Sequence, residues 1–181
     1  MKLFWLVLAL FTLTACSGGH HAMYYTAYQN ALSKTNSAPA PDNADQLFRN
    51  VFNNLQSADL HAAIDESYAK QFYFNDTFKT ITDSASLKDY LSKTGRAVTK
   101  FEVTLEDVVQ SDEDVYVRWT MTMQFKVLGK TIDSHSVGMS HLRFNEAGQI
   151  IVHQDFWDGA DAFYQHLPVV GFWVRAIRNR L

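Results

Sequence analysis

The chain has 181 residues, of which 47% are hydrophobic and 14% aromatic, a composition sufficient for one packed domain. Its formal net charge is −3 and no lysine and arginine cluster lies inside the domain, so the sequence lacks the basic surface that nucleic acid binding requires. The single cysteine excludes an internal disulfide, and stability must therefore come from packing.

The first sixteen residues have the pattern of an export signal. Lys2 precedes an apolar run over residues 3–13, and the sequence Leu-Thr-Ala-Cys then ends at Cys16. This pattern resembles the lipobox of bacterial lipoproteins, in which the cysteine becomes the acylated first residue of the mature protein. The apolar run is shorter than the ~20 residues that a membrane-spanning helix needs. A cleaved signal that merely ends near a cysteine is the alternative.

We therefore predict a signal peptide over residues 1–15, lipidation of Cys16 and a lipid-anchored location in the bacterial cell envelope. Ser17, in place of aspartate, resembles lipoproteins sorted to the outer membrane, so we expect the protein on the periplasmic face of that membrane. Residues 16–41 are rich in glycine, alanine, serine and proline, which is typical of a tether between membrane and domain. A short helix over residues 23–32 is the alternative for this segment.

The predicted domain covers residues 42–158 and changes its hydrophobic period half-way. Apolar residues first recur at helical spacing and later alternate with polar residues, as they do in strands. Helices followed by a long antiparallel meander are an α+β arrangement. The sequence predicts helices near residues 47–55, 60–64 and 87–91, an aromatic strand over residues 72–76, and four strands near residues 101–109, 117–125, 131–144 and 149–157.

The turn at residues 128–129 sets the register of the two strands that flank it. As a two-residue turn it places Trp119 opposite Gly138 and Met121 opposite Ser136. Because side chains alternate between the faces of a strand, these large and small residues share one face of the sheet. Small residues between large neighbours leave room, so we expect a pocket over this part of the sheet.

The loop at residues 145–148 sets the register of the last strand in the same way. It pairs Ser140 with His153 and Gly138 with Asp155, so that a carboxylate faces the predicted pocket. A carboxylate in an apolar cavity has a raised pKa, which is how proteins obtain a general base that works near neutrality. The alternative is that the carboxylate lies at the margin of the sheet in water.

One segment carries a family resemblance. Residues 140–148, Ser-His-Leu-Arg-Phe-Asn-Glu-Ala-Gly, resemble the Asp-His-Phe-Arg-Phe-Asn-Gly-Ala-Gly segment of ketosteroid isomerases. Residues 42–158 are thereby similar to the nuclear transport factor 2-like superfamily, which includes SnoaL-like cyclases, ketosteroid isomerases and limonene epoxide hydrolases. The resemblance implies a cone-shaped fold in which a curved antiparallel sheet carries the N-terminal helices on its concave face.

The resemblance places the general base of the isomerases on Asp76, but it does not supply their oxyanion hole. The protonated aspartate of that hole falls on Ser140, and its tyrosine falls on Val51 or Phe52. Loss of one such donor costs roughly 2.7–4 kcal/mol in other enzymes. The sequence therefore argues against steroid isomerisation.

The end of the last strand carries a second resemblance. Residues 153–158, His-Gln-Asp-Phe-Trp-Asp, resemble the Trp-Arg-Asp-Tyr-Phe-Asp ending of epoxide hydrolases and SnoaL-like proteins, whose first aspartate is an acid or base in the pocket. Asp155 takes that position. The hydrolases also need Arg-x-Asp on an earlier strand, where this chain has Arg-Trp-Thr at residues 118–120. The resemblance thus argues against epoxide hydrolysis as well.

We predict an envelope lipoprotein whose SnoaL-like domain binds a small hydrophobic molecule in its cone. The alternative is an isomerase, cyclase or hydrolase that uses Asp155 or Asp76 as general acid or base, and a third hypothesis is a structural dimer with a filled cone. We expect no cofactor and no metal site, because the histidines are dispersed and there is no nucleotide-binding loop. The expected ligand contacts are Trp119, Met121, Gly138, Ser140, His153, Phe74 and Val51.

Residues 159–181 are predicted to form an amphipathic helical extension, with its helix over residues 169–181. Apolar side chains at helical spacing are accompanied there by three arginines, and Phe172 and Trp173 widen the apolar surface. Such a helix can lie on a bilayer, which fits a protein anchored at Cys16. Packing across its own sheet or against a partner in a homodimer is the alternative.

Overall fold

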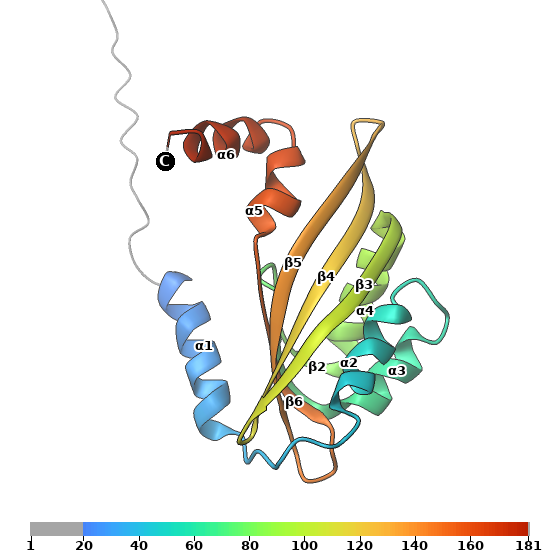
Figure 1. Cartoon of the computed structure of the whole chain (residues 1–181), viewed down its shortest axis with the longest axis vertical. Coiled ribbons are helices and arrows are strands. Elements are labelled where there is room, and N and C mark those ends of the chain that lie inside the picture. Colours follow the sequence, from blue (N-terminus) through green and yellow to red (C-terminus); the bar gives the residue numbers. More distant parts are fainter. Residues whose placement is uncertain (1–19, 181) are drawn as a thin grey trace, which may run out of the picture.

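The computed structural model describes the backbone of residues 20–180 and the side chains of residues 25–180 (Figure 1). The predicted signal peptide and Cys16 lie outside these residues. The helical elements are α1 (His20–Lys34), α2 (Ala44–Asn53), α3 (Leu60–Ser67), α4 (Ser84–Ala97), α5 (Gly159–Ala162), the 3-10 turn η1 (Tyr164–His166) and α6 (Val170–Arg178). The strands are β1 (Tyr68–Asn75), β2 (Thr80–Asp83), β3 (Val98–Ser111), β4 (Asp114–Val127), β5 (Lys130–Phe144) and β6 (Ile150–Trp157).

The strands of the described chain form one curved sheet in the order β2-β1-β6-β5-β4-β3. Neighbouring strands are antiparallel except for β1 and β6, which run parallel. Helices α2, α3 and α4 cover the concave face, and α1 lies on the opposite face against β6 (Figure 1). The predicted α+β cone with N-terminal helices on the concave face is confirmed.

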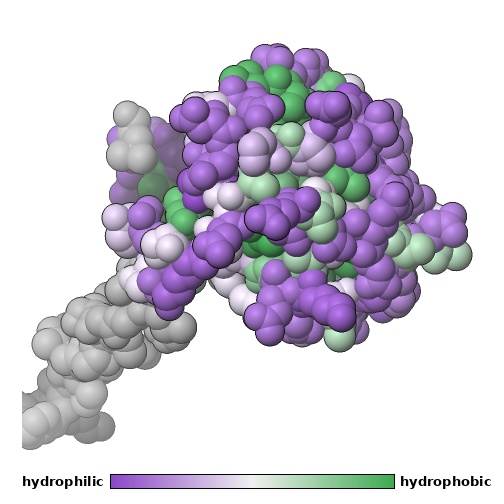
Figure 2. Space-filling view, turned by 90° about the horizontal axis from the view of Figure 1, so that it is seen from below, coloured by the Kyte–Doolittle hydropathy of each residue, from purple (hydrophilic) through white to green (hydrophobic). Residues whose placement is uncertain are grey.

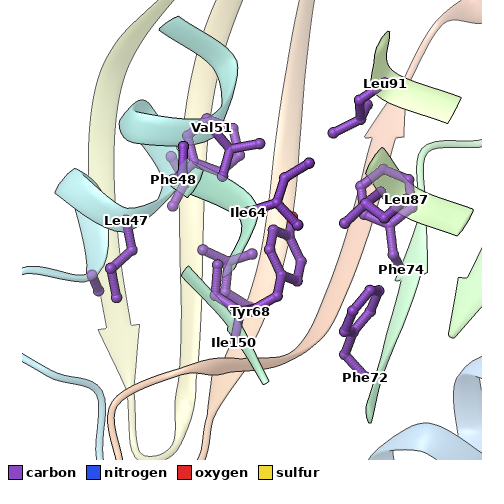
Figure 3. Packing of buried hydrophobic residues seen from close by; sticks show 14 of the residues in the cluster. Leu47, Phe48, Val51, Ile64, Tyr68, Phe72, Phe74, Leu87, Leu91 and Ile150 are labelled. Atoms are coloured by element: carbon purple, nitrogen blue, oxygen red, sulfur yellow. The ribbon is translucent and has the colours of Figure 1, made fainter. Parts of the chain in front are cut away.

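The hydrophobic core lies between the concave face and the three helices that cover it. Helix α2 turns Leu47, Phe48 and Val51 inward, because residues three or four positions apart share one face of a helix (Figure 3). Phe74 of β1 and Leu87 of α4 meet this face, and both are fully buried. Burial of each such side chain contributes about 1.5–3 kcal/mol, so the core fixes the helices on the sheet.

The predicted register between β4 and β5 is confirmed. Trp119 pairs with Gly138 and Met121 with Ser136 across a two-residue turn. The turn residues Leu128 and Gly129 both have a positive φ, of 49° and 79°, which is the conformation of the hairpin turn that matches strand twist. Large side chains of β4 therefore share the concave face with small residues of β5.

The predicted register between β5 and β6 is wrong by two residues. Ser140 pairs with Asp155 and not with His153, and Gly138 pairs with Trp157 and not with Asp155. A shift of two keeps every side chain on its predicted face, because the strand period is also two. The predicted set of concave-face residues therefore stands, whereas the neighbour of Asp155 changes.

Two local features cause this shift. The Asn145 side chain accepts hydrogen bonds from the backbone N–H of Ala147 and Gln149, and the loop is thereby one residue longer than predicted, with Phe144 opposite Ile150. A β-bulge then leaves Ile151 without a partner on β5. Each feature displaces the pairing by one residue. Neither can be recognised from the alternation of apolar and polar residues in the sequence.

Helix α1 occupies most of the segment that was predicted to be a tether. Its Tyr28 hydroxyl lies 2.7 Å from His141 Nδ1, and Arg143 of β5 donates to the Leu32 carbonyl at 3.1 Å. Ala38 then forms an isolated β-bridge with Phe144. The tether prediction over residues 16–41 is corrected for residues 28–38, which contact β5, and the alternative of a helix over residues 23–32 falls within α1.

In the C-terminal extension, the helix predicted over residues 169–181 corresponds to α6, and two further short elements precede it. The chain leaves β6 at Trp157 and passes through α5 and η1 before α6 begins at Val170. Helix α6 lies at the upper end of the molecule in Figure 1, beside the tip of the β4–β5 hairpin. Among residues 20–180, no helix combines the length and the apolar character needed to cross a bilayer.

A buried histidine connects α1 to the outer face of the sheet. His141 Nε2 lies 2.7 Å from Asp114 Oδ1, which also accepts a hydrogen bond from Arg143 Nε. Burial lowers the pKa of His141 below its ordinary value of 6.5, and this effect exceeds the opposite effect of the Asp114 hydrogen bond and charge. The imidazole therefore resists protonation as long as α1 covers it.

This arrangement predicts a pH-dependent stability. The unfolded chain binds a proton on His141 below about pH 6.5 that the folded chain binds only at lower pH, so the free energy of unfolding falls as the pH drops through that value. Urea denaturation between pH 5 and 7.5 should show a smaller pH dependence in His141→Gln than in the wild type. Tyr28→Phe should lose roughly 0.5–1.5 kcal/mol but keep the titration. Equal pH dependence in wild type and His141→Gln would contradict the assignment.

Candidate functional site

A cavity of about 600 Å³ lies between the concave face of the sheet and helices α2 and α4. Apolar and aromatic side chains form most of its wall, as in sites for small hydrophobic molecules. Phe163 and Leu167, which flank η1, complete the wall at one end. Asp76, Asp155, Tyr90, Thr94 and Lys126 are the lining residues with polar side chains.

Asp155 is held in the cavity wall by its neighbours on β5 and β6. The residue is 6% exposed, and Oδ1 accepts a hydrogen bond from Ser140 Oγ at 2.5 Å and lies 2.8 Å from His153 Nε2. Ser140 Oγ in turn accepts a hydrogen bond from Trp119 Nε1 at 2.9 Å. Oδ2 has no hydrogen-bond partner among the described residues, so one oxygen is fixed and the other is available.

Tyr68 contacts His153 on the side of the ring away from Asp155. This contact bears on which nitrogen of His153 carries the proton. The Tyr68 hydroxyl lies 2.5 Å from His153 Nδ1, and burial, with the charges of Asp155 and Asp76, raises the pKa of Tyr68 well above 10. Tyr68 therefore keeps its proton. A carboxylate oxygen only accepts hydrogen bonds, so His153 donates from Nε2 to Asp155 Oδ1, and in an imidazole with a single ring proton Nδ1 then accepts from the Tyr68 hydroxyl. A continuous buried chain of hydrogen bonds thus runs from Tyr68 to Trp119.

Asp76 lines the same cavity but has a different environment. Its Oδ1 accepts hydrogen bonds from the backbone N–H of Phe78 at 3.0 Å and of Lys79 at 2.9 Å, and its Oδ2 accepts one from the Tyr90 hydroxyl. Burial raises the pKa of Asp76, with a further contribution from the charge of Asp155, against the opposing effect of these hydrogen bonds. Both oxygens are occupied, so Asp76 organises the turn after β1.

The predicted ligand contacts separate into two groups. Phe74, Trp119 and Met121 line the cavity, as do the two predicted acids. Ser140 and His153 are fully buried and lie behind Asp155, which they position. The remaining two predicted contacts, Val51 in the core under α2 and Gly138 under the Trp119 ring, are also absent from the cavity wall.

Gly138 has a structural role that corrects the expected location of the empty space. A Cβ at this position would lie 2.3 Å from Cη2 of the Trp119 ring, so the indole fills the space over the small residues of β5. Ser134, four residues earlier, donates to the Ala162 carbonyl at 2.7 Å and is covered by α5. The cavity therefore lies on the far side of Trp119, between this ring and the helices.

Sequence reasoning missed two tyrosines of the site. Tyr68 begins β1 and lies an even number of residues before Phe74, so the alternation of a longer strand would have placed both on one face. Tyr90 lies three residues after Leu87 on α4, which is the spacing of one helical face. Neither spacing shows that the hydroxyl groups reach His153 and Asp76, because those contacts join distant parts of the chain.

The chemical capacity of the site is that of a positioned carboxylate in an apolar cavity. Such a group can accept a hydrogen bond from the polar end of a ligand, or it can accept a proton. Within residues 20–180 there is no group of three or more histidine, cysteine, aspartate or glutamate side chains that could hold a metal ion. The predicted lack of a metal or cofactor stays a prediction.

Comparisons with known proteins identify the family to which the fold belongs. Residues 48–153 match the SnoaL-like domain family, and these residues include β1, β3, β4, β5 and most of the cavity wall. None of the curated proteins compared with the sequence matches it. The segment with α5, η1 and α6 lies beyond the matched residues.

Solved structures with the same fold come from several bacteria. A protein from Shewanella denitrificans OS-217, described as a SnoaL-like polyketide cyclase, has 17% identity and a TM-score of 0.57, over 67% of this chain and 94% of that one. An LEH-like epoxide hydrolase from M. tuberculosis has 17% identity and a TM-score of 0.54, over 66% and 86%. A protein of ketosteroid isomerase-like fold from Catenulispora acidiphila, in complex with trimethylamine, has 13% identity and a TM-score of 0.55, over 68% and 90%. At these identities the likeness concerns the fold.

The contact between Gly138 and Trp119 predicts the effect of one methyl group. Gly138→Ala should lower the free energy of unfolding by about 1–3 kcal/mol, because the ring cannot move away without loss of its bond to Ser140. Val137→Ala is the matched control, since Val137 is 71% exposed on the other face, and it should change stability by less than about 0.5 kcal/mol. Urea denaturation of both variants tests this, and a Gly138→Ala protein as stable as the wild type would refute the packing.

Proposed function

The chain belongs to the SnoaL-like domain family, and from this premise we propose that it binds a small hydrophobic molecule in the cavity of its cone. The observation that carries the proposal is a cavity of about 600 Å³ whose wall is almost entirely apolar. Cavities of about 300–1,000 Å³ with a few convergent polar groups are typical of small-molecule sites. The resemblance of the sequence that ends at Cys16 to a lipobox supports the further proposal that binding takes place at the bacterial cell envelope.

The polar groups in the wall define the chemistry of the ligand. Asp155 Oδ2 is free, whereas both oxygens of Asp76 already accept hydrogen bonds. A ligand that matches this wall is apolar over most of its surface and carries one hydrogen-bond donor, such as a hydroxyl group, near Asp155. A carboxylate or phosphate at this end of the ligand would lie against the two acidic side chains and is disfavoured.

A larger side chain in the cavity wall should weaken binding. N-phenyl-1-naphthylamine is uncharged and apolar, and its fluorescence rises in an apolar site, so it serves as the probe. Met121→Trp places a larger side chain in the cavity wall and should weaken binding at least tenfold. Met139→Trp is the matched control, because Met139 is partly exposed on the outer face of β5, and it should bind like the wild type. Equal affinity of the two variants, both checked for folding by circular dichroism, would argue against the cavity as the binding site.

A second candidate function, proton transfer by Asp155, is favoured by a specific observation. Ser140 and His153 fix one oxygen of the carboxylate, and the other oxygen is left free in the cavity wall. A base held in this way needs little rearrangement when it takes a proton from a carbon next to a carbonyl group. In such a step the proton moves to Oδ2 and the electron pair of the C–H bond moves to the carbonyl oxygen. In a ketone with a double bond one carbon farther from the carbonyl group, the electron pair is shared over the conjugated system, and return of the proton to the far carbon of that double bond completes an isomerisation.

Isotope exchange tests this second function. 2-Tetralone is an apolar ketone with acidic hydrogens next to its carbonyl, and its exchange with deuterium in D₂O can be followed by NMR. The wild type should accelerate exchange over buffer, and Asp155→Asn should lose at least 100-fold of this acceleration but keep the affinity for N-phenyl-1-naphthylamine. No acceleration by the wild type, or equal rates for both proteins, would remove proton transfer and leave binding as the proposed function.

A further inference from the structure

The segment after β6 connects the cavity to the surface of the protein. Phe163 lies 5.4 Å, between ring centroids, from both Phe125 and Phe78, so its ring packs on the cavity wall from outside the sheet. Leu167 lines the same end of the cavity. Helix α6 begins two residues after Pro168. The residues that line this end of the cavity, Phe163 and Leu167, therefore belong to the same continuous segment as α6.

Helix α6 presents its apolar side chains to the outside. Phe172, Trp173 and Ile177 are 62%, 61% and 58% exposed, and they lie on one side of the helix. The opposite side faces the protein: Gly171 is buried there, and Arg178 forms an ion pair with Asp158 at 3.1 Å. A helix on the surface of a soluble protein normally has the opposite orientation, with its polar side toward water and its apolar side toward the protein.

The beginning of the described chain indicates what covers this surface. Cys16 precedes His20 by four residues, so an acyl anchor at Cys16 lies no more than about 14 Å from the start of α1. Helix α1 contacts Arg143 with Leu32 and Phe156 with Tyr28, so its earlier residues point along β6 toward α5. In Figure 1, α1 and α6 lie on the same flank of the sheet, and the first turn of α1 is its end nearer to α6.

A bilayer fits this geometry better than a second copy of the chain. The nine residues of α6 make a helix about 14 Å long, and one side of it is much smaller than the ~800 Å² per partner of a stable interface. A tryptophan, a phenylalanine and the exposed Arg180 are the residue types that anchor helices at the membrane–water interface. The end of the molecule seen in Figure 2, opposite to α6, is mostly hydrophilic, with hydrophobic areas between the hydrophilic ones.

We propose that the outer side of α6 lies in the membrane interface and holds the end of the cavity lined by Phe163 and Leu167 against the bilayer, so that the ligand is a membrane-resident apolar molecule. This inference rests on the proposed binding function. The acyl anchor brings the domain to the membrane, and α6 orients it. A ligand that passes from bilayer to cavity by this route leaves the lipid next to Phe163 and does not cross bulk water.

Vesicle binding without the acyl chain tests the inference. Residues 16–181 with Cys16→Ser contain every described residue and are mixed with vesicles of phosphatidylethanolamine and phosphatidylglycerol at 3:1. Phe172→Ser with Trp173→Ser should lower the partition into vesicles at least tenfold, since both side chains are exposed and their loss leaves the core intact. Val108→Ser with Val109→Ser removes exposed apolar side chains from β3 and is the matched control, which should bind like the parent protein.

Transfer of N-phenyl-1-naphthylamine separates the two proposals. The α6 variant should bind this probe in solution with unchanged affinity but take it from preloaded vesicles at least tenfold more slowly than the parent. Normal probe binding without any vesicle binding by the parent overturns the inference about α6 and leaves the proposed function in place. Absence of probe binding in solution overturns the proposed function itself. A dimer that dissociates in the α6 variant, measured by sedimentation velocity, assigns the surface to a second copy and also overturns the inference.

Discussion

The hydrogen bonds to one oxygen of Asp155 are the constraint on which the concave face of the sheet depends. A carboxylate that is almost fully buried is costly unless its lone pairs have donors. Ser140 and His153 supply these donors to Oδ1, and Trp119 and Tyr68 supply the next bonds outward on each side. Four polar side chains from four strands are thereby fixed around one acid, and the free oxygen is left in the cavity wall.

The position of Trp119 follows from the same network. Its indole nitrogen donates to Ser140, and its ring lies over Gly138, where a side chain of any other residue would meet it. The ring therefore forms a floor for the cavity. The apolar wall and the positioned acid are consequences of one arrangement, because a displaced indole would both leave Ser140 without its donor and open the floor. The proposed binding and the proposed proton transfer thus depend on the same contacts.

The outer face of the sheet is organised around a second buried group. His141, the residue after Ser140, points away from the cavity and joins Tyr28 of α1 to Asp114. Alternation along β5 thus assigns Ser140 to the site and His141 to the attachment of α1. The N-terminal helix and the C-terminal segment lie outside the residues that match the family, and together they distinguish this chain from an isolated SnoaL-like domain.

The sequence by itself determined the fold, the faces of the strands and the register between β4 and β5, since alternation and a two-residue turn are local features. It also placed Asp155, Asp76 and Trp119 in the cavity wall. Only the tertiary structure decided that Ser140 is the neighbour of Asp155, because a bulge at Ile151 leaves the alternation unchanged. Contacts between distant parts of the chain, such as those that seat α1 on β5, depend on partners whose positions no local pattern encodes.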